Sequence, residues 1–177
     1  MPDSASLERS VSTADAAETR RLAASVAAAA QPGDLVCLWG ELGAGKTQFA
    51  KGFGAGLGVE GTITSPTFVL MSEYDGRLPL FHVDLYRLAD GADAFAGGVV
   101  DDRQAAGVTL VEWPERMAEL LPDRRLDVVI DGTGAEPRRI TLRAGHPAFE
   151  RYVGQGAPSA QADRSASPAS SAAEGAA

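Results

Sequence analysis

The chain of 177 residues is poor in several residue types, and each shortage excludes a class of protein or site. Its single cysteine, Cys37, has no partner for an internal disulfide, and its place inside an apolar run favours core packing over catalysis. The sequence contains no asparagine, so the N-K-x-D motif with which small GTPases read guanine is absent. The two histidines, His82 and His146, have no partner at metal-ligand spacing, which argues against a structural metal site built on them.

Long apolar runs are missing as well. The runs Leu35–Trp39 and Val108–Val111 are far shorter than the roughly 18 to 20 residues that cross a bilayer, so we expect no transmembrane helix and no membrane partner. The start of the chain, Met1–Ser4, has neither the basic residues nor the apolar stretch of a secretory signal. We therefore expect a cytoplasmic protein.

Positive charge is scarce. The formal net charge is −8, and lysine occurs only as Lys46 and Lys51. An acidic chain repels phosphate backbones at long range, so we expect this protein to reach nucleic acid only indirectly, through a partner. The length suffices for one well-packed domain and is too short for two ordinary ones.

Composition and periodicity divide the chain into three parts. Residues 1–11 show no convincing period and predict a flexible N-terminus, whereas residues 12–152 predict one folded domain. Residues 153–177 are rich in Ala, Ser, Gly and Pro and almost lack large apolar side chains. Such a segment does not offset its ordering entropy, so we predict a disordered tail.

Within the domain, periodicity and turn signals predict alternating strands and helices. Ser12 or Thr13 is expected to cap a first helix, which ends at Gln31. The turn dipeptide Asp75–Gly76 predicts an antiparallel hairpin. The fold class is therefore α/β, a P-loop NTPase-like mixed sheet with a parallel core and antiparallel hairpins, flanked by helices. The expected strands are 35–39, 67–74, 78–83, 108–111, 126–130 and 139–143, and the expected later helices are 47–57, a loose helix within 90–107, and 115–121.

A phosphate-binding motif lies between the predicted strand 35–39 and the predicted helix 47–57. Glycines in such a loop let backbone N–H groups and the positive helix end face an anion. Lys46 adds a point charge, and the hydroxyl of Thr47 suits a magnesium ion that bridges the phosphates. We therefore predict ATP or ADP with Mg²⁺ as cofactors of a P-loop nucleotide-binding domain. The full match to the Walker A pattern G-x-x-x-x-G-K-[ST] consists of Gly40, Glu41, Leu42, Gly43, Ala44, Gly45, Lys46 and Thr47.

A magnesium site of this type also needs an acidic residue at the end of a neighbouring strand. Glu112 ends the predicted strand 108–111, and Asp84 ends the predicted strand 78–83. Spacing does not choose between them, and a metal-assisted hydrolase uses two carboxylates, one at the metal and one that orients water or the terminal phosphate. The segment Thr64–Thr67 supplies hydroxyls where nucleotide switches often lie, although a plain loop before a strand explains it equally well.

Four ordered blocks of the sequence resemble the TsaE family, which is also known as YjeE. They are Gly40–Thr47, Thr64–Phe68, His82–Leu88 and Val111–Glu115. The resemblance covers residues 12 to 144 and implies a small ATPase of tRNA threonylcarbamoyladenosine biosynthesis. It implies TsaB and TsaD as partners, which transfer the threonylcarbamoyl group to adenosine beside the anticodon, so that tRNA is met only through that complex.

The resemblance also implies roles for single residues. Lys46 and the loop amides would bind phosphates, and Thr47 and Glu112 would hold Mg²⁺. Lys46 and Asp84 would be the catalytic residues of a weak, partner-stimulated ATPase that converts ATP to ADP and phosphate. The residues expected beside the nucleotide, beyond the loop, are Trp113, Thr19 and Arg139.

Two other functions stay open at this point. The first is a nucleotide-dependent binding module that need not hydrolyse ATP, and the second is a small-molecule kinase. Arg138, Arg139 and Arg143 offer charge for a kinase, yet the sequence has no lid-like insertion. The stretch 89–95 departs from the family pattern, which often has a glutamate- and leucine-rich helix there, so we expect a different contact surface.

Overall fold

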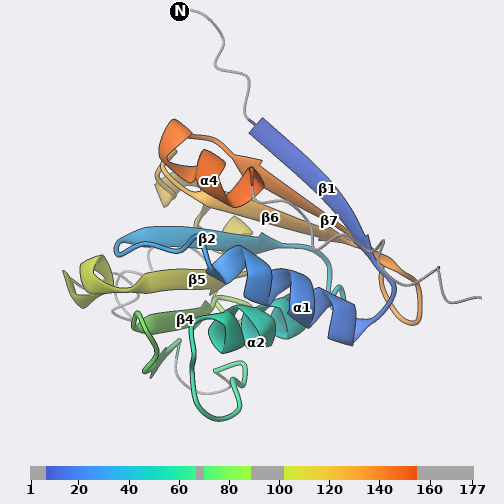
Figure 1. The fold of residues 1–177 in the computed structure, drawn as a ribbon, viewed down its shortest axis with the longest axis horizontal. Coiled ribbons are helices and arrows are strands. Elements are labelled where there is room, and N and C mark those ends of the chain that lie inside the picture. Colours follow the sequence, from blue (N-terminus) through green and yellow to red (C-terminus); the bar gives the residue numbers. More distant parts are fainter. Residues whose placement is uncertain (1–6, 67–69, 89–101, 155–177) are drawn as a thin grey trace, which may run out of the picture.

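A single seven-stranded mixed sheet organises the molecule, with the strand order β1-β7-β6-β2-β5-β4-β3 (Figure 1). The computed structural model describes residues 7–66, 70–88 and 102–154. The strands are β1 (Leu7–Thr13), β2 (Asp34–Trp39), β3 (Met71–Tyr74), β4 (Leu80–Asp84), β5 (Val108–Glu112), β6 (Leu126–Asp131) and β7 (Arg138–Ala144). The helices are α1 (Ala16–Ala27), α2 (Lys46–Gly56) and α4 (Glu150–Val153), and the 3-10 helices are η1 (Asp102–Ala106), η2 (Pro114–Leu120) and η3 (Pro147–Phe149).

The pairing of the strands confirms the predicted fold class. Strand β2 pairs in parallel with β5 and β6, and β4 pairs in parallel with β5. The outer pairs β1–β7, β6–β7 and β3–β4 are antiparallel. The continuous apolar run of β2 follows from its central place, because Val36, Cys37 and Leu38 are all buried. Burial also raises the pKa of the Cys37 thiol, in keeping with the predicted packing role of this residue.

Helices α1 and α2 lie side by side against the sheet (Figure 1). Their backbones approach so closely that a Cβ on Gly52 would lie 2.2 Å from the carbonyl oxygen of Arg20, and a Cβ on Gly56 would lie 2.4 Å from that of Ala24. Glycine lowers the intrinsic helix propensity of α2, but it allows this contact. The shared core includes Leu22, Val26, Phe49 and Phe53 from the helices and Leu38, Leu110 and Val128 from the sheet.

The N-terminal boundary differs from the prediction. Residues 7–11, which were predicted as part of a flexible N-terminus, belong to the edge strand β1 (Leu7–Thr13), which pairs with β7 along its whole length. The predicted caps Ser12 and Thr13 are also wrong, since both belong to this strand. Asp15 caps α1 instead: its Oδ1 accepts from the amide of Glu18 at 2.8 Å, and the Glu18 carboxylate accepts from the amide of Ala14 at 2.7 Å. This arrangement resembles a capping box, except that the Glu18 carboxylate bonds to the amide before the cap and not to that of Asp15 itself.

Several later predictions agree with the structure in type and differ in their bounds. The hairpin around Asp75–Gly76 is present as β3 and β4, although residues 67–69 of its first predicted strand lie outside the described residues. The predicted helix 115–121 is the 3-10 helix η2, broken at Met117 by a φ of −135°. Of the loose helix predicted within 90–107, the part up to residue 101 lies outside the described residues, and η1 covers 102–106.

The C-terminal end of the domain is fixed to the start of β2. The Tyr152 hydroxyl donates to Asp34 Oδ2 at 2.5 Å, the Arg151 guanidinium donates to the same oxygen, and the amide of Gln31 donates to it at 2.8 Å. Val153 is buried in α4, so the domain runs one residue past the predicted boundary. The predicted disordered tail, from residue 155 onward, lies outside the described residues. Within the described ranges, no helix has the length and apolarity needed to cross a membrane.

Candidate functional site

The phosphate-binding motif forms a turn between β2 and α2. Gly40, Gly43 and Gly45 have φ angles of +148°, +83° and +105°, a region that favours glycine. A Cβ on Gly40 would lie 2.6 Å from the carbonyl oxygen of Ile130 in β6, whereas a Cβ on Gly43 or Gly45 would meet no atom within 4 Å. The first glycine therefore lets the loop pass close to the sheet, and the other two allow its backbone conformation. The loop ends at the N-terminus of α2, an arrangement that suits an anion.

Lys46, the first residue of α2, folds back over this loop. Its ammonium donates to the carbonyl oxygens of Gly40 at 2.5 Å and Glu41 at 3.0 Å. Burial lowers the pKa of Lys46, and the carboxylates of Glu112, Glu115 and Asp84 oppose that shift. The positive charge is thus held at the mouth of the loop.

Trp113 covers the Lys46 ammonium, which lies 3.6 Å from the centroid of the indole ring. The ring of Tyr86 contacts the same indole at a centroid separation of 4.8 Å. Among the described residues, Trp113 is the only residue other than glycine that has a positive φ, of 61°. A left-handed conformation at a bulky residue is unfavourable, and such residues concentrate at functional sites. The turn from β5 into η2 therefore places this indole against the loop at some conformational cost.

The two predicted carboxylates lie at the same edge of the sheet. In the parallel pair β4–β5, Asp84 is the register partner of Glu112, and Glu112 is also the partner of Leu38, two residues before the loop. Thr47 Oγ1 donates to Glu112 Oε2 at 3.2 Å. Geometry therefore makes Glu112, rather than Asp84, the carboxylate beside the Thr47 hydroxyl, a choice that spacing in the sequence left open.

Asp84 is held by the loop before β3 and by the turn after β4. Its Oδ2 accepts a hydrogen bond from the Ser65 hydroxyl, and its Oδ1 accepts one from the amide of Tyr86 at 2.9 Å. The Ser65 contact ties the predicted hydroxyl-bearing segment to the site. Residues 67–69 of that region lie outside the described residues.

His82 is a member of the site that sequence reasoning missed. Its Nε2 lies 2.9 Å from Glu112 Oε1, and both side chains are buried. Two signals were available: His82 begins the block His82–Leu88 of the family resemblance, and it lies two positions before Asp84, so that both share a face of one strand. The sequence gives no indication that Glu112 lies across from that face.

A cavity of about 260 Å³ lies on the other side of the loop. The start of α1 contributes Thr19, a buried residue whose hydroxyl lies 2.9 Å from that of Thr13 and also contacts the carbonyl oxygen of Asp15 at 3.1 Å. The cavity is lined by Ala14, Asp15, Ala16, Thr19, Gly43, Ala44, Gly45, Gln48, Gly134, Ala135, Glu136 and Arg138. Thr19 therefore lines a cavity next to the loop, and its expected place beside the nucleotide stays a prediction.

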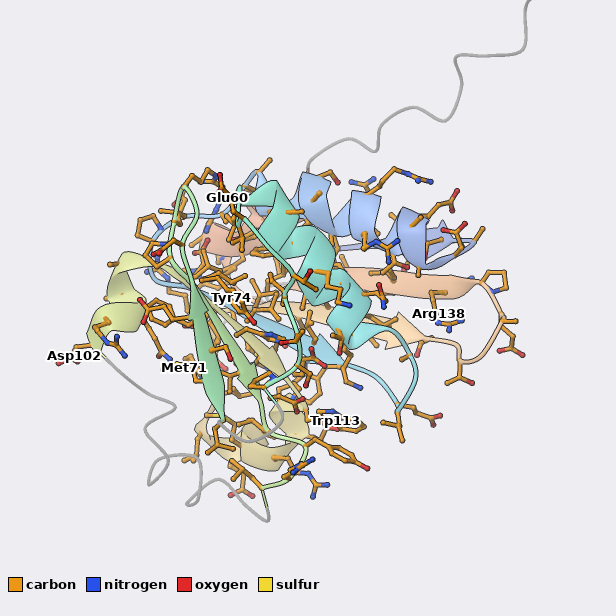
Figure 2. All side chains as sticks on the ribbon, turned by 90° about the horizontal axis from the view of Figure 1, so that it is seen from below. Glu60, Met71, Tyr74, Asp102, Trp113 and Arg138 are labelled. Atoms are coloured by element: carbon orange, nitrogen blue, oxygen red, sulfur yellow. The ribbon has the colours of Figure 1, made fainter. Side chains whose placement is uncertain are left out.

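Arg138, and not the predicted Arg139, reaches the loop. Arg138 Nε donates to the carbonyl oxygen of Ala44 at 2.9 Å, and Nη2 donates to that of Gly134 at 2.8 Å. Arg139 is exposed, because successive residues of a strand face opposite sides of the sheet and the core side of β7 carries Arg138 and Ile140. Figure 2 shows Arg138 and Trp113 on either side of the turn that leads into α2.

The residues at the loop fit a magnesium nucleotide. Thr47 and Glu112 present hard oxygen donors side by side, and Mg²⁺ is commonly held by one or two protein oxygens together with phosphates and waters. Over the described ranges, no group of three or more His, Cys, Asp and Glu side chains is placed to hold a metal ion by itself. A magnesium ion here would therefore need the oxygens of its nucleotide.

Comparisons with known proteins find similar sequences and a similar fold. The model of the family described as threonylcarbamoyl adenosine biosynthesis protein TsaE matches residues 13–140. The chain is 45% identical over 133 residues to tRNA threonylcarbamoyladenosine biosynthesis protein TsaE of Bacillus subtilis, which spans 75% of this chain and 83% of the relative. It is 41% identical over 127 residues to the protein of the same name from Treponema pallidum, and the match spans 72% of this chain and 94% of that relative. The crystal structure of YdiB from Bacillus subtilis is similar with a TM-score of 0.66 and 41% identity, over 83% of this chain and 92% of that one.

Proposed function

The chain belongs to the TsaE family, and from this premise we propose that it is a P-loop ATPase that supports threonylcarbamoyl transfer to adenosine beside the tRNA anticodon. Proteins of this family act in tRNA threonylcarbamoyladenosine biosynthesis. One observation carries the ATPase part of the proposal: Lys46, Thr47, Glu112 and Asp84 converge at one end of the sheet around a glycine-rich turn.

The phosphates of ATP bind to the amides of Gly43 to Thr47 and to the Lys46 ammonium. Lys46 gives up its contacts with the carbonyl oxygens of Gly40 and Glu41 for phosphate oxygens, which are stronger partners because they are charged. Thr47 and Glu112 would hold the magnesium ion, which would neutralise charge on the terminal phosphates. The ribose and base occupy the cavity between Thr19 and Arg138.

Hydrolysis depends on Asp84. Its carboxylate is held by Ser65 and by the amide of Tyr86 next to Glu112, where it orients a water molecule for attack on the terminal phosphorus. The water oxygen forms a bond to this phosphorus while the bond to the ADP oxygen breaks, and the proton that the water loses passes to solvent, which gives ADP and inorganic phosphate. Orientation of water by a weakly basic carboxylate is consistent with slow turnover in isolation.

The partners we propose are the TsaB and TsaD proteins, on which the ATPase acts. A net charge of −8 is unfavourable for direct contact with tRNA, so the chain meets tRNA only through this assembly. ATP hydrolysis is weak for the chain alone and is stimulated by the partners.

The test is ATP hydrolysis by the purified chain, alone and with the TsaB and TsaD proteins of the same organism. We expect clear stimulation by the pair and none with Lys46→Ala as the matched blank. Absence of Mg-ATP binding in calorimetry would refute the ATPase. Unchanged threonylcarbamoyladenosine in tRNA from cells depleted of the protein, with no second copy present, would refute its role in the modification.

A second candidate is a nucleotide-dependent binding module without obligatory hydrolysis. One observation favours it: both oxygens of Asp84 accept hydrogen bonds within the protein, as in a purely structural carboxylate. Asp84→Asn separates the two functions. If this variant keeps nucleotide affinity and partner binding but does not support modification, hydrolysis is required; if it supports modification, binding is sufficient.

A further inference from the structure

His82, a buried residue of β4, contacts Glu112, the carboxylate of the proposed magnesium site. We propose that His82 is a positioning residue: its ring fixes the Glu112 carboxylate so that Oε2 faces Thr47, and it thereby sets the affinity of the nucleotide site for Mg²⁺. This inference rests on the proposed function, because it assumes that a magnesium nucleotide binds at the loop. His82 itself is too deeply buried to contact that nucleotide.

The two oxygens of Glu112 are held by different elements. Oε1 lies 2.9 Å from His82 Nε2 on β4, and Oε2 accepts from Thr47 Oγ1 on α2 at 3.2 Å. A carboxylate that is anchored through one oxygen has a fixed plane and a fixed direction for the other. In many proteins, a residue that is hydrogen-bonded to a metal-binding side chain orients that side chain. His82 therefore determines where the free lone pairs of Oε2 point.

The hydrogen-bond pattern also defines what His82 contributes. A carboxylate only accepts, so Nε2 carries the hydrogen. Nδ1 is buried without a hydrogen-bond partner among the described residues. The hydrogen bond to Glu112 is therefore the one that holds the ring, and through it the ring orients the carboxylate.

Packing alone does not explain a histidine at this position. Its register partner on β5 is Leu110, and Leu80 lies two residues earlier on the same face of β4; both are buried members of the apolar core. An apolar side chain at position 82 would suit these neighbours better. It would also leave Glu112 Oε1 buried without its hydrogen-bond donor, an unfavourable state for a carboxylate.

The experiment compares His82→Gln with His82→Asn. Both variants carry a neutral amide, but the glutamine nitrogen takes the place of Nε2, whereas the asparagine nitrogen takes the place of Nδ1 and does not reach Glu112. Calorimetry measures the affinity of each variant for a non-hydrolysable ATP analogue with and without Mg²⁺. We expect His82→Asn to weaken Mg²⁺-dependent binding about 10- to 100-fold, and His82→Gln to stay within about threefold of the unchanged chain.

Two controls separate positioning from general damage. Val83→Ala removes buried volume at the next position of β4, on the opposite face, and should leave Mg²⁺ dependence unchanged. Affinity without Mg²⁺ should be the same within about twofold in all folded variants, since His82 does not contact phosphates. In a Glu112→Gln background, His82→Asn should have no additional effect on Mg²⁺ dependence.

The outcomes distinguish this inference from the proposed function. If the unchanged chain binds the nucleotide without any effect of Mg²⁺, the proposed function and the inference both fail. If the unchanged chain depends on Mg²⁺ and His82→Asn depends on it to the same extent, only the inference is overturned. Equal losses in His82→Gln and His82→Asn, or an additional loss in the Glu112→Gln background, also overturn it.

Discussion

Thr47 and Glu112 are 65 positions apart in the sequence, yet the hydroxyl of Thr47 donates to Glu112 Oε2 at 3.2 Å. The parallel pairing of β2 with β5 produces this contact, because it sets Leu38 beside Glu112 and the loop follows β2 directly. Carboxyl ends of adjacent parallel strands meet at one edge of a sheet, where ligands bind in open α/β folds. A substitution of Glu112 therefore tests the proposed site directly.

Glu112→Gln should separate nucleotide binding from magnesium-dependent chemistry. The amide is similar in size but has no charge, so we expect ATP hydrolysis to fall about 100-fold or more while affinity for ATP without Mg²⁺ changes little. Single-turnover hydrolysis and calorimetry measure the two effects. Glu119→Gln, an exposed substitution in η2, is the control and should behave like the unchanged chain. Equal hydrolysis by both variants would contradict a metal-binding role for Glu112.

Asp84→Asn should slow hydrolysis strongly and change nucleotide binding little. The substitution removes the charge that orients water but leaves the loop and Lys46 unchanged, so we expect a loss of about 100-fold in kcat and less than about threefold in nucleotide affinity. Ser65→Ala removes one hydrogen bond to Asp84 and should cause a smaller loss in kcat. Asp75→Asn, in the exposed hairpin turn, is the matched control. A kcat that is unaffected in Asp84→Asn would favour the binding module.

The parts of this site that the sequence predicted are local or lie at the ends of strands. The loop Gly40–Thr47 is a contiguous pattern, and Glu112 ends an apolar run. Both can therefore be recognised in the sequence without knowing which strands are neighbours in the sheet. The contacts of His82 depend on which strand lies beside β4, and that order is not encoded in the spacing of residues. The same reason hides β1, whose burial pattern is weak and whose strand character comes from pairing with β7.

Arg138 and Arg139 show that a difference of one position along a strand changes which contacts a side chain makes. A shift of one residue reverses which side of the sheet a strand side chain faces, so Arg138 contacts the loop although the family resemblance indicated Arg139. The helix that ends the domain was not predicted, for another reason. The short helix α4 has little helical signal of its own, and the contacts of Arg151 and Tyr152 with Asp34 hold it in place.

Arg138→Ala and Arg139→Ala should therefore differ. Loss of the hydrogen bonds from Arg138 to the carbonyl oxygens of Ala44 and Gly134 loosens the loop, and one or two such bonds correspond to about tenfold in nucleotide affinity. Arg139→Ala should change affinity by less than about twofold, because its side chain is exposed on the other side of β7. Calorimetry with ADP measures both variants. Greater weakening by Arg139→Ala would show that Arg139, and not Arg138, supports the nucleotide.

Trp113 should report nucleotide binding by fluorescence. The Lys46 ammonium lies over its indole ring, and phosphate binding moves that charge, so we expect a change in emission when ADP is added. The second tryptophan, Trp39, donates from its indole nitrogen to Asp127 at 2.7 Å and serves as the control. The signal should persist in Trp39→Phe and vanish in Trp113→Phe. The reverse pattern would show that Trp113 does not sense the occupied loop.

Tyr152 should make the stability of the fold sensitive to alkaline pH. Burial raises the pKa of its hydroxyl above the ordinary value, and the hydrogen bond to Asp34 adds to this shift. The folded chain therefore holds this proton at a pH where the unfolded chain has lost it. The resulting stability is complete below about pH 10, the value for an unfolded tyrosine, and declines above it by up to about 1.4 kcal/mol per pH unit.

Comparison with Tyr152→Phe isolates this contribution. At neutral pH the variant lacks a buried hydrogen bond and should be about 1 to 2 kcal/mol less stable. Above about pH 10 the difference should narrow, since phenylalanine has no proton to lose. Urea unfolding between pH 8 and pH 11 measures the two curves, and Tyr86→Phe, at an exposed tyrosine, should run parallel to the unchanged chain. A stability difference that stays constant across this range would mean that Tyr152 ionises alike in the folded and unfolded chain, and its contact with Asp34 would then not hold the proton.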